Sequence, residues 1–304
     1  MKDSFDHVQE DPKSSLSVPK CKKILVFSID DKFTHHLSAA LNSIIENNKT
    51  PIDVIVFCFN LPEKNLEILQ RYQRQSIKKL TLIEVDTRTF NNLHETLQFP
   101  RASYGRFLAP GFVSPDDYLL YLDADIIVLQ DLGEIFEIDL ADYPVGGTSN
   151  IDQSALSRLL GEDCEGGYLD SGLLLFNVKK WEEDNLSKKI VKKILESGHM
   201  WSTPDNHGLN VVLKGKFLPI PRKYSYDTRN YFIFPQTREE GKNAHILQFA
   251  GPVKPDSYLC LDYFKHVYAH HLLQTPFAKL LDSDKNLKNF IKKFKSRKKY
   301  HGKY

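Results

Sequence analysis

The first third of the ordered sequence alternates short apolar runs with amphipathic segments. The apolar runs have the length of buried strands, and they lie at residues 24–29, 51–60 and 80–86. The segments between them, 34–48 and 61–75, carry leucine and isoleucine at helical spacing, and Thr34 is the predicted N-cap of the first. Strands that alternate with helices predict an α/β fold with a mainly parallel sheet, covered by helices on both faces.

The same pattern continues through the middle of the chain. Further strands are expected at residues 116–122, 143–150 and 167–178. Residues 186–198 form an amphipathic pattern that predicts a helix, with Gly198 as its C′ residue. In parallel sheets ligands bind beyond the carboxyl ends of the strands, so the residues that follow each strand are the candidates for function.

Three regions differ in composition. Residues 1–20 are polar, contain two prolines and predict a disordered arm, whereas residues 21–262 carry the α/β pattern. Residues 263–304 end in a basic, amphipathic segment with nine Lys or Arg and no acid from position 285 onward. Its apolar residues follow i, i+3, i+4, i+7 spacing, and they are Leu287, Phe290, Ile291 and Phe294.

A helix with one apolar face and a cationic rim is typical of proteins that bind the surface of an anionic membrane. Each basic residue near such a surface contributes about 1 kcal/mol. The alternatives are a disordered basic tail and a helix that packs on the domain. The segment has no aromatic platform for stacking bases, so we expect no nucleic-acid binding.

Composition narrows the class of protein. The chain has 304 residues, 41% of them hydrophobic, and a formal net charge of +2, which is typical of an ordinary globular protein. None of its four cysteines stands in a C-x-x-C spacing, so the sequence gives no support for a zinc or redox motif. The first twenty residues lack the apolar stretch of a signal peptide, and no window is apolar enough to span a membrane. We therefore expect a cytoplasmic enzyme, peripheral to the membrane if the tail binds lipid.

Two aspartates interrupt an otherwise apolar stretch, DDYLLYLDADIIVLQDL. Alternate residues of an extended segment point the same way, so Asp123 and Asp125 are predicted to converge. Burying two unpaired carboxylates together is costly, and a divalent cation removes that cost. Hard oxygen ligands suit Mn²⁺ or Mg²⁺. The alternative is a pair of surface carboxylates at an ordinary strand end, which is how we interpret the second Asp-x-Asp sequence, residues 282–284.

Several spaced motifs resemble those of glycosyltransferase family 8, which includes bacterial lipopolysaccharide galactosyl- and glucosyltransferases. They are, in chain order, RASYGRFLAPGFVSPDDYLLYLDADIIVLQDL, GYLDSGLLLFNVKKW, DNHGLN and FAGPVKP. The resemblance covers residues 23–256. It implies a GT-A fold over residues 21–262, a UDP-sugar donor, Mn²⁺, and retention of the anomeric configuration.

The resemblance also implies roles for single residues. Asp30 and Lys32 match positions that contact uridine, and Phe33 matches an aromatic that stacks on uracil. Helix capping by Asp30 and core packing by Phe33 are the alternatives. Arg106 matches an arginine near the phosphates and sugar of the donor, where its alternative is a surface salt bridge. The remaining nucleotide-sugar contacts are Asp123, Ala124, Asp125, Gly251 and Lys254.

The sequence departs from the family pattern at several catalytic positions. Asp170 stands where the family usually has Asn, and Asp205 with Asn206 stands for an Asp-Gln pair beside the donor sugar. The metal-binding His of the closing motif is replaced by Gln248, whose carbonyl oxygen can ligate Mn²⁺ or Mg²⁺. The metal ligands implied are therefore Asp123, Asp125 and Gln248. In the alternative interpretation Gln248 does not bind the ion and only contacts the residues that do.

The function that follows is transfer of a hexose, galactose or glucose, from a UDP-sugar to a hydroxyl of a glycan or lipid-linked acceptor. Front-face attack and a covalent intermediate on Asp170 or Asp205 both remain open. A non-catalytic UDP-sugar-binding scaffold is the main alternative, because the residues usual in the family are replaced by Gln248, Asn206 and His207. A nucleotidyltransferase is less favoured, since no Gly-rich phosphate loop follows the first strand.

Overall fold

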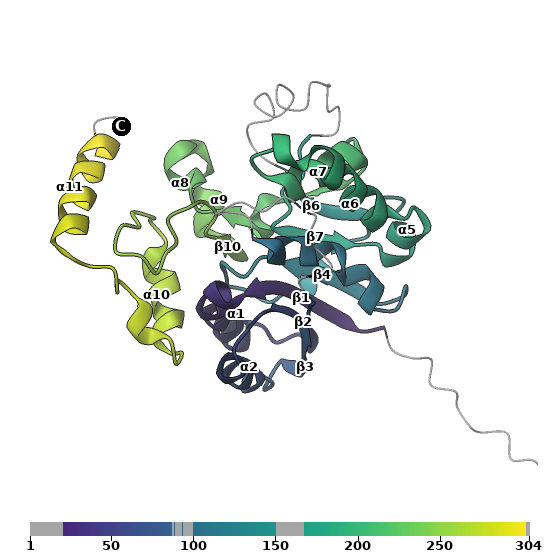
Figure 1. Ribbon diagram of the computed structural model, residues 1–304, viewed down its shortest axis with the longest axis horizontal. Coiled ribbons are helices and arrows are strands. Elements are labelled where there is room, and N and C mark those ends of the chain that lie inside the picture. The colour runs from purple at the N-terminus through teal and green to yellow at the C-terminus, as the bar shows by residue number, and fades with distance from the viewer. Residues whose placement is uncertain (1–20, 87, 89–92, 94–99, 150–166, 302–304) are drawn as a thin grey trace, which may run out of the picture.

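A computed structural model describes residues 21–86, 88, 93, 100–149 and 167–301. Within them seven strands form one sheet in the order β3-β2-β1-β4-β7-β6-β8 (Figure 1). All of them run parallel except β7, which is antiparallel to both of its neighbours. The strands are β1 (Lys23–Asp30), β2 (Ile52–Phe59), β3 (Ile77–Glu84), β4 (Tyr118–Leu122), β6 (Val145–Thr148), β7 (Leu173–Phe176) and β8 (Leu218–Ile220).

Alternation along β1 divides the core into two layers. Leu25, Phe27 and Ile29 point to one face, where they pack with the buried residues of α1 (Thr34–Asn47) and α2 (Glu63–Gln70). Ile24 and Val26 point to the opposite face. That face is covered by α5 (Val178–Glu183), α6 (Leu186–Ser197) and α7 (Pro204–Leu213).

A second sheet of three strands, in the order β5-β10-β9, lies beside the first among the described residues (Figure 1). Its strands are β5 (Ile126–Val128), β9 (Tyr226–Asp227) and β10 (Ile246–Gln248). They share a third core cluster with α10 (Lys265–Leu273), whose Tyr268 and Leu272 are fully buried. The first part of the C-terminal region thus packs into the main body.

Short helices complete the chain. The α-helical ones are α3 (Gly133–Phe136), α8 (Asn230–Ile233) and α9 (Arg238–Lys242). The 3-10 turns are η1 (Asp31–Phe33), η3 (Arg101–Phe107), η4 (Ala109–Phe112), η5 (Gly198–Met200), η6 (Arg222–Tyr224), η7 (Pro235–Thr237) and η8 (Ala278–Leu280).

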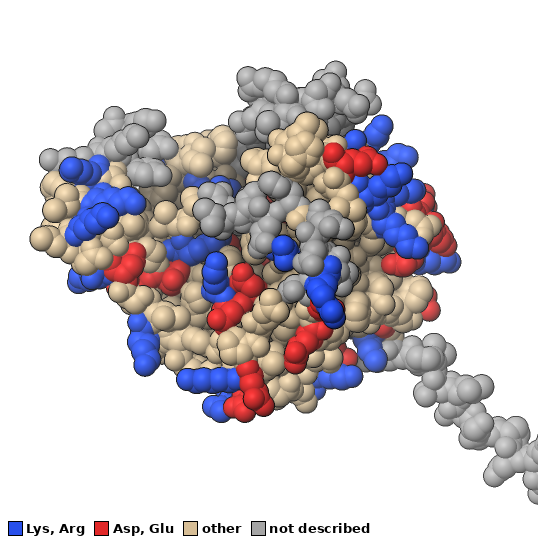
Figure 2. All heavy atoms as spheres, viewed as in Figure 1, with Lys and Arg blue, Asp and Glu red and all other residues tan. Residues whose placement is uncertain are grey.

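The last helix, α11 (Leu287–His301), extends away from both sheets (Figure 1). Its four apolar residues, Leu287, Phe290, Ile291 and Phe294, are between 46% and 75% exposed. Basic side chains gather in the region of the same helix, which carries Lys288, Lys292, Lys293 and Lys295 (Figure 2). In the part of the chain that the structure describes, no helix is long and apolar enough to cross a bilayer.

The α/β fold with a mainly parallel sheet is confirmed, and two local predictions are wrong. Thr34 is the first residue of α1 rather than its cap, because the 3-10 turn η1 leads directly into the helix and places Phe33 at the N-cap position. Gly198 keeps a right-handed φ of −60° because the chain tightens into η5 instead of reversing. The predicted arm, 1–20, lies outside the described residues.

Candidate active site

The candidate site lies where β1 and β4 end. The two strands pair in parallel, so the residues that follow them meet at one edge of the sheet. Asp30 ends β1 and is followed by η1, which carries Lys32 and Phe33. Asp123 follows β4 directly, so the Asp-x-Asp sequence occupies the link to β5 rather than the interior of a strand.

Arg106, from η3, connects the aspartates of two distant elements. Its Nη2 lies 3.0 Å from Oδ1 of Asp123 and 3.3 Å from Oδ2 of Asp205, which belongs to the first turn of α7. Its Nε and Nη1 donate to the backbone carbonyls of Ser103 and Ser171, at 2.8 and 2.9 Å. All three nitrogens are therefore occupied, and only 3% of the residue is exposed. Arg106 is a buried charge that holds two carboxylates, not a surface salt bridge.

Asp123 receives two further hydrogen bonds. The Tyr121 hydroxyl donates to Oδ1 at 3.0 Å, and Nε2 of Gln248 donates to Oδ2 at 3.3 Å. Oε1 of Gln248 accepts from the Ser225 hydroxyl at 3.1 Å. A Cβ atom on Gly172 would come within 1.9 Å of Nε2, so glycine is required there for Gln248 to reach the site. Position 248 therefore lies beside the Asp-x-Asp carboxylate, as the motif predicts.

The electrostatics of Asp123 are unusual for a carboxylate. Burial raises its pKa from the ordinary 3.8 to about 6. The charge of Arg106 lowers the pKa, and the negative charges of Asp125, Asp170 and Asp205 raise it further. The protein thus gathers more carboxylates around Asp123 than a single arginine neutralises.

Asp125 has a different partner. Its Oδ2 accepts a short hydrogen bond from Nζ of Lys254, and only 6% of the residue is exposed. Nζ also lies 3.2 Å from the Phe249 carbonyl and 5.7 Å from the centre of the Phe33 ring. The predicted phosphate lysine and the predicted uracil-stacking ring therefore lie together, next to one carboxylate of the Asp-x-Asp pair.

Comparison with known proteins places these features in a family. The glycosyl transferase family 8 model matches residues 24–260, which is most of the chain. The chain belongs to glycosyl transferase family 8. The prediction from the motifs is therefore confirmed at the level of the family, and with it the prediction that the chain is a glycosyltransferase.

Individual relatives are distant in sequence. A lipopolysaccharide 1,2-glucosyltransferase of Escherichia coli K12 is 24% identical over 217 residues, which cover 70% of this chain and 64% of the relative. A lipopolysaccharide 1,3-galactosyltransferase of Salmonella typhimurium is 21% identical, over 76% of this chain and 72% of that protein. The chain thus spans slightly less than two thirds of the first of these relatives.

Solved structures agree with the fold. Galactosyltransferase LgtC, in complex with donor and acceptor sugar analogues, matches with a TM-score of 0.73 and 21% identity, covering 83% of this chain and 96% of that one. The glycosyltransferase GlyE of Streptococcus pneumoniae matches with a TM-score of 0.65, covering 87% and 63%. The predicted GT-A architecture is therefore confirmed.

Two site residues of this family member were missed by sequence reasoning. Asp227 pairs with Gln248 in register across β9 and β10, and it forms a two-pronged ion pair with Arg229, with Nε at 3.0 Å from both carboxylate oxygens. Burial has the largest effect on the pKa of Asp170 and raises it. The charge of Asp227 raises this pKa further, and the charge of Arg229 lowers it. The signal was the Asp-Thr-Arg sequence after an aromatic stretch, which is weak by itself.

The closing motif packs against this pair. Gly251 has a φ of +99°, and a Cβ atom there would lie 3.3 Å from Cδ of Arg229. Asp170 accepts a 3.0 Å hydrogen bond from the backbone N–H of Gly172. Asp170, Gly251, Asp227 and Arg229 therefore lie together in one part of the site.

The other predicted residues lie at its margin. The Asn206 side chain accepts a 3.1 Å hydrogen bond from Asn210 within α7, so its oxygen is engaged inside the helix. Lys32 is exposed, Ala124 is buried, and Oδ1 of Asp30 is buried without a hydrogen-bond partner. Burial raises the pKa of Asp30, and neighbouring backbone N–H groups and Lys32 lower it.

The oxygen ligands that the site offers fit a hard divalent cation. The described residues of the site contribute more acids than bases: Asp123, Asp125, Asp170, Asp205 and Asp227 against Arg106, Arg229 and Lys254. Oδ1 of Asp205 is also buried without a hydrogen-bond partner. Carboxylate and amide oxygens are ligands that Mn²⁺ and Mg²⁺ accept. An added positive charge would relieve the repulsion that raises the pKa of Asp123.

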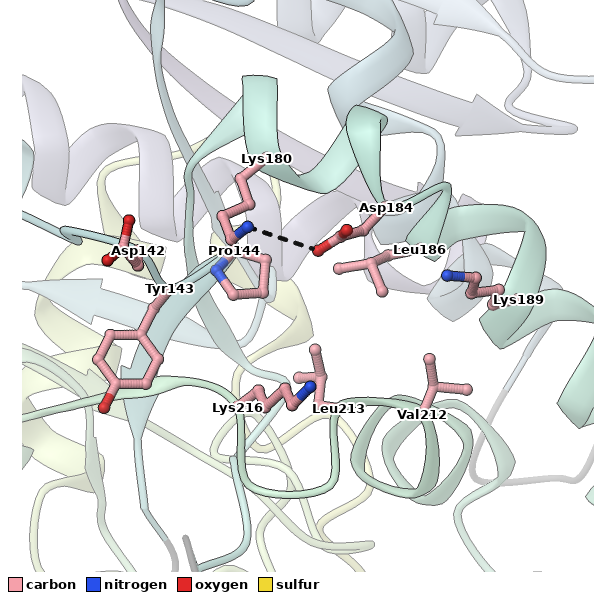
Figure 3. Close-up of a pocket in the computed structure, with 10 residues that line it drawn as sticks. All are labelled: Asp142, Tyr143, Pro144, Lys180, Asp184, Leu186, Lys189, Val212, Leu213 and Lys216. Atoms are coloured by element: carbon pink, nitrogen blue, oxygen red, sulfur yellow. Dashed lines mark ion pairs between the residues drawn. The ribbon is translucent and has the colours of Figure 1, made fainter.

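A separate hollow of about 420 Å³ lies on the face covered by α5, α6 and α7 (Figure 3). It is lined by Tyr143, Pro144 and the side chains of three lysines, Lys180, Lys189 and Lys216. Nζ of Lys180 lies 3.9 Å from Asp184. None of the residues of the candidate site lines this hollow, so it is not part of that site.

Proposed function

We propose that this chain transfers a hexose, galactose or glucose, from a UDP-sugar to a hydroxyl of a glycan or lipid-linked acceptor. The anomeric configuration would be retained, and the ion would be Mn²⁺ or Mg²⁺. The names of the relatives support the sugar class, since they include a lipopolysaccharide glucosyltransferase and a lipopolysaccharide galactosyltransferase. The same relatives support a role in building lipopolysaccharide or a comparable glycan.

One observation carries the proposal. Asp123 and Asp125 lie at the carboxyl edge of the sheet between two cations, Arg106 and Lys254, and Lys254 also faces the Phe33 ring. A uracil stacked on Phe33 would bring its diphosphate to Lys254 and the two aspartates. A divalent ion held there would stabilise the charge on the departing diphosphate.

Each neighbouring side chain has a defined task in this scheme. Lys254 would exchange Asp125 for a phosphate oxygen, as a mobile point charge can. Arg106 holds Asp123 and Asp205 in place because its other nitrogens are fixed to backbone carbonyls. Oδ1 of Asp205, which has no partner, would accept a hydrogen bond from a donor-sugar hydroxyl.

The resemblance to the family favours front-face attack, with a covalent intermediate on Asp170 or Asp205 as the alternative. Intact-mass measurement of the enzyme, quenched during turnover with a slow donor, separates the two routes. Front-face attack leaves the mass unchanged. A gain of one hexose, absent in Asp170→Ala or Asp205→Ala, would identify the nucleophile.

Donor turnover tests the function. The full chain is incubated with Mn²⁺ and separately with UDP-galactose, UDP-glucose and UDP-N-acetylglucosamine, and released UDP is measured. We expect release from one of the two hexose donors, stimulated by metal and abolished by a chelator. Equal slow release from all donors, with or without metal, would contradict the proposal.

A second candidate function, a UDP-sugar-binding scaffold without turnover, is favoured by a specific observation. The carboxylates of Asp125 and Asp123 already face Lys254 and the amide nitrogen of Gln248. If those contacts persisted with nucleotide bound, the ion would be displaced. Tight binding of UDP in calorimetry, unchanged by Mn²⁺ and accompanied by no turnover, would select the scaffold.

The proposal includes a place of action. α11 combines exposed apolar residues with lysines, a composition typical of helices at an anionic lipid surface. Binding there would hold the enzyme beside a lipid-linked acceptor without a membrane-spanning segment.

A further inference from the structure

We propose that His35, His36 and Asp256 form a second metal site, which takes a Zn²⁺-class ion and is distinct from the Asp-x-Asp centre. The two histidines are in the first turn of α1, and Asp256 lies in the loop after β10. Their ligand atoms all lie within 4.8 Å of one another. Neither the family motifs nor the reaction requires this cluster.

The spacing of the atoms fits one ion. Nε2 of His35 lies 3.4 Å from Oδ2 of Asp256, and Nε2 of His36 lies 3.6 Å from Oδ1. Ligands about 2.1 Å from a tetrahedral Zn²⁺ are separated from one another by about 3.4 Å. Each imidazole nitrogen therefore lies about one tetrahedral edge from an oxygen of Asp256, His35 from Oδ2 and His36 from Oδ1, and a fourth position is left for water.

The hydrogen bonding of the cluster is incomplete in the way that a missing ion explains. Nε2 of His35 and Oδ1 of Asp256 are buried and form no well-aligned hydrogen bond, and the 3.4 Å approach of Nε2 to Oδ2 of Asp256 is a long contact. Buried polar atoms usually have hydrogen-bond partners, so two such atoms without good partners in one cluster indicate a ligand site. Both atoms belong to the set that would bind the ion.

The contact with Tyr268 allows His36 to take the tautomer that a metal requires. Its Nδ1 lies 2.7 Å from the Tyr268 hydroxyl, and Tyr268 is fully buried on α10. An Nδ1–H that donates to this oxygen leaves Nε2 with a free lone pair directed at the cluster.

The ligand set selects the ion. Two imidazoles and one carboxylate suit Zn²⁺ or Co²⁺, whereas the carboxylates of the Asp-x-Asp centre suit Mn²⁺ and Mg²⁺. The two sites therefore differ in chemistry as well as in position. Because Asp256 lies two residues after Lys254, an ion here would fasten the loop that carries Lys254 to the first turn of α1, next to Phe33.

A second group of the same residue types serves as an internal control. Glu46, His270 and His271 also lie within 4.8 Å of one another. The His270 side chain is 65% exposed, and its Nε2 is already 3.0 Å from Gln274. Nδ1 of His271 faces Asn42 at 3.3 Å. These ring nitrogens are engaged, so this group predicts at most weak, surface-type binding.

Metal titration tests the site without reference to sugar transfer. Full-length protein free of any added histidine tag is stripped with a chelator and titrated with Zn²⁺ by equilibrium dialysis, in excess Mg²⁺ to occupy hard sites. We expect one tightly bound Zn²⁺ per chain. Co²⁺ should give the intense visible bands of a tetrahedral site, and Zn²⁺ should raise the melting temperature.

Matched variants assign the ligands. His35→Ala and the nearly isosteric Asp256→Asn should weaken Zn²⁺ binding more than about tenfold and remove both the Co²⁺ bands and the melting shift. His270→Ala and Asp125→Ala should bind Zn²⁺ as the wild type does. Circular dichroism establishes that each variant is folded.

Three results would overturn the proposal. They are the absence of stoichiometric Zn²⁺ binding in the wild type, equal affinity in His35→Ala and Asp256→Asn, and loss of binding in His270→Ala or Asp125→Ala. The last would place the ion in the surface group or in the Asp-x-Asp centre. Because the measurement uses no nucleotide, it stands or falls separately from the proposed transferase activity.

Discussion

Charged residues are buried in the active site, whereas apolar residues are exposed on α11. Arg106 is 3% exposed and Asp125 is 6% exposed, and each is held by partners from distant elements. On α11 the apolar residues are the exposed ones, from 46% for Ile291 to 75% for Leu287, and lysines lie on the same helix. Burial makes Arg106 and Asp125 indispensable to their partners, whereas the exposed apolar residues of α11 contribute little to the stability of the fold.

This contrast separates two kinds of effect. Substitutions of the buried charges Arg106 and Asp125 should change chemistry or folding, because removing one buried charge leaves others unpaired. Changes in α11 should alter where the protein binds and leave the chemistry intact.

The largest effect is expected for Asp125→Ala. Losing a metal-binding carboxylate should reduce turnover by about a thousandfold or more, because the leaving diphosphate loses most of its stabilisation. UDP release measures the effect. Asp284→Asn, in the second Asp-x-Asp sequence, is the matched control and should keep turnover near the wild-type rate. Near wild-type turnover in Asp125→Ala would mean that the metal assignment is wrong.

Arg106→Met should destabilise the protein by about 3–5 kcal/mol, because Asp123 and Asp205 would remain buried without their cation. Chemical denaturation measures the loss. Adding Asp123→Asn to the same chain should recover part of it, since one unpaired charge is then removed. If Arg106→Met unfolded at the wild-type denaturant concentration, the buried network would have no role in stability.

A chain ending at Asp284 should lose binding to anionic vesicles while UDP release stays within about twofold of the full chain. At about 1 kcal/mol for each basic residue near the surface, loss of the cluster should lower partitioning by about a hundredfold or more. Co-sedimentation measures it, and salt should release the full chain. Equal sedimentation of the two chains would mean that α11 does not bind the anionic surface.

Binding of Mn²⁺ should weaken as the pH falls below 6. The pKa of Asp123 is raised to about 6, and an ion binds only the deprotonated carboxylate. Between pH 7 and pH 5 the deprotonated fraction falls from about nine tenths to about one tenth, so affinity should drop about tenfold. Calorimetry at the two pH values checks this. A constant affinity would mean that Asp123 does not ligate the ion.

The smallest effect is expected for Gln248→His. Imidazole suits Mn²⁺, so affinity should be preserved or rise a few-fold. The location of Gln248 beside Asp123 supports that outcome. A large loss of Mn²⁺ affinity would show that position 248 is not the counterpart of the family's histidine.

Much of the fold could be predicted because alternation and helical spacing are local. The β1 run and the α1 pattern were each placed within a residue or two of their bounds. Helix ends were less predictable. The conformations of Thr34 and Gly198 depend on the adjoining 3-10 turns, which no single residue predicts. The Asp-x-Asp pair was found because two acids in an apolar stretch have few explanations.

The remainder of the site depends on long-range pairing. Asp227 reaches the site only because β9 pairs with β10, a contact between short strands that periodicity does not reveal. Asp256 meets His35 and His36 across more than two hundred residues of chain, and no local sequence pattern links the three. Such juxtapositions follow from topology rather than from local pattern.

Binding of Mn²⁺ in the presence of UDP tests the central claim most directly. Free Mn²⁺ gives an electron paramagnetic resonance signal that is lost on binding, so titration counts bound ions. The account predicts about one UDP-dependent Mn²⁺ per chain in the wild type and none at the same concentrations in folded Asp125→Ala. Equal Mn²⁺ binding by the two proteins, or UDP binding in the wild type that recruits no Mn²⁺, would contradict it.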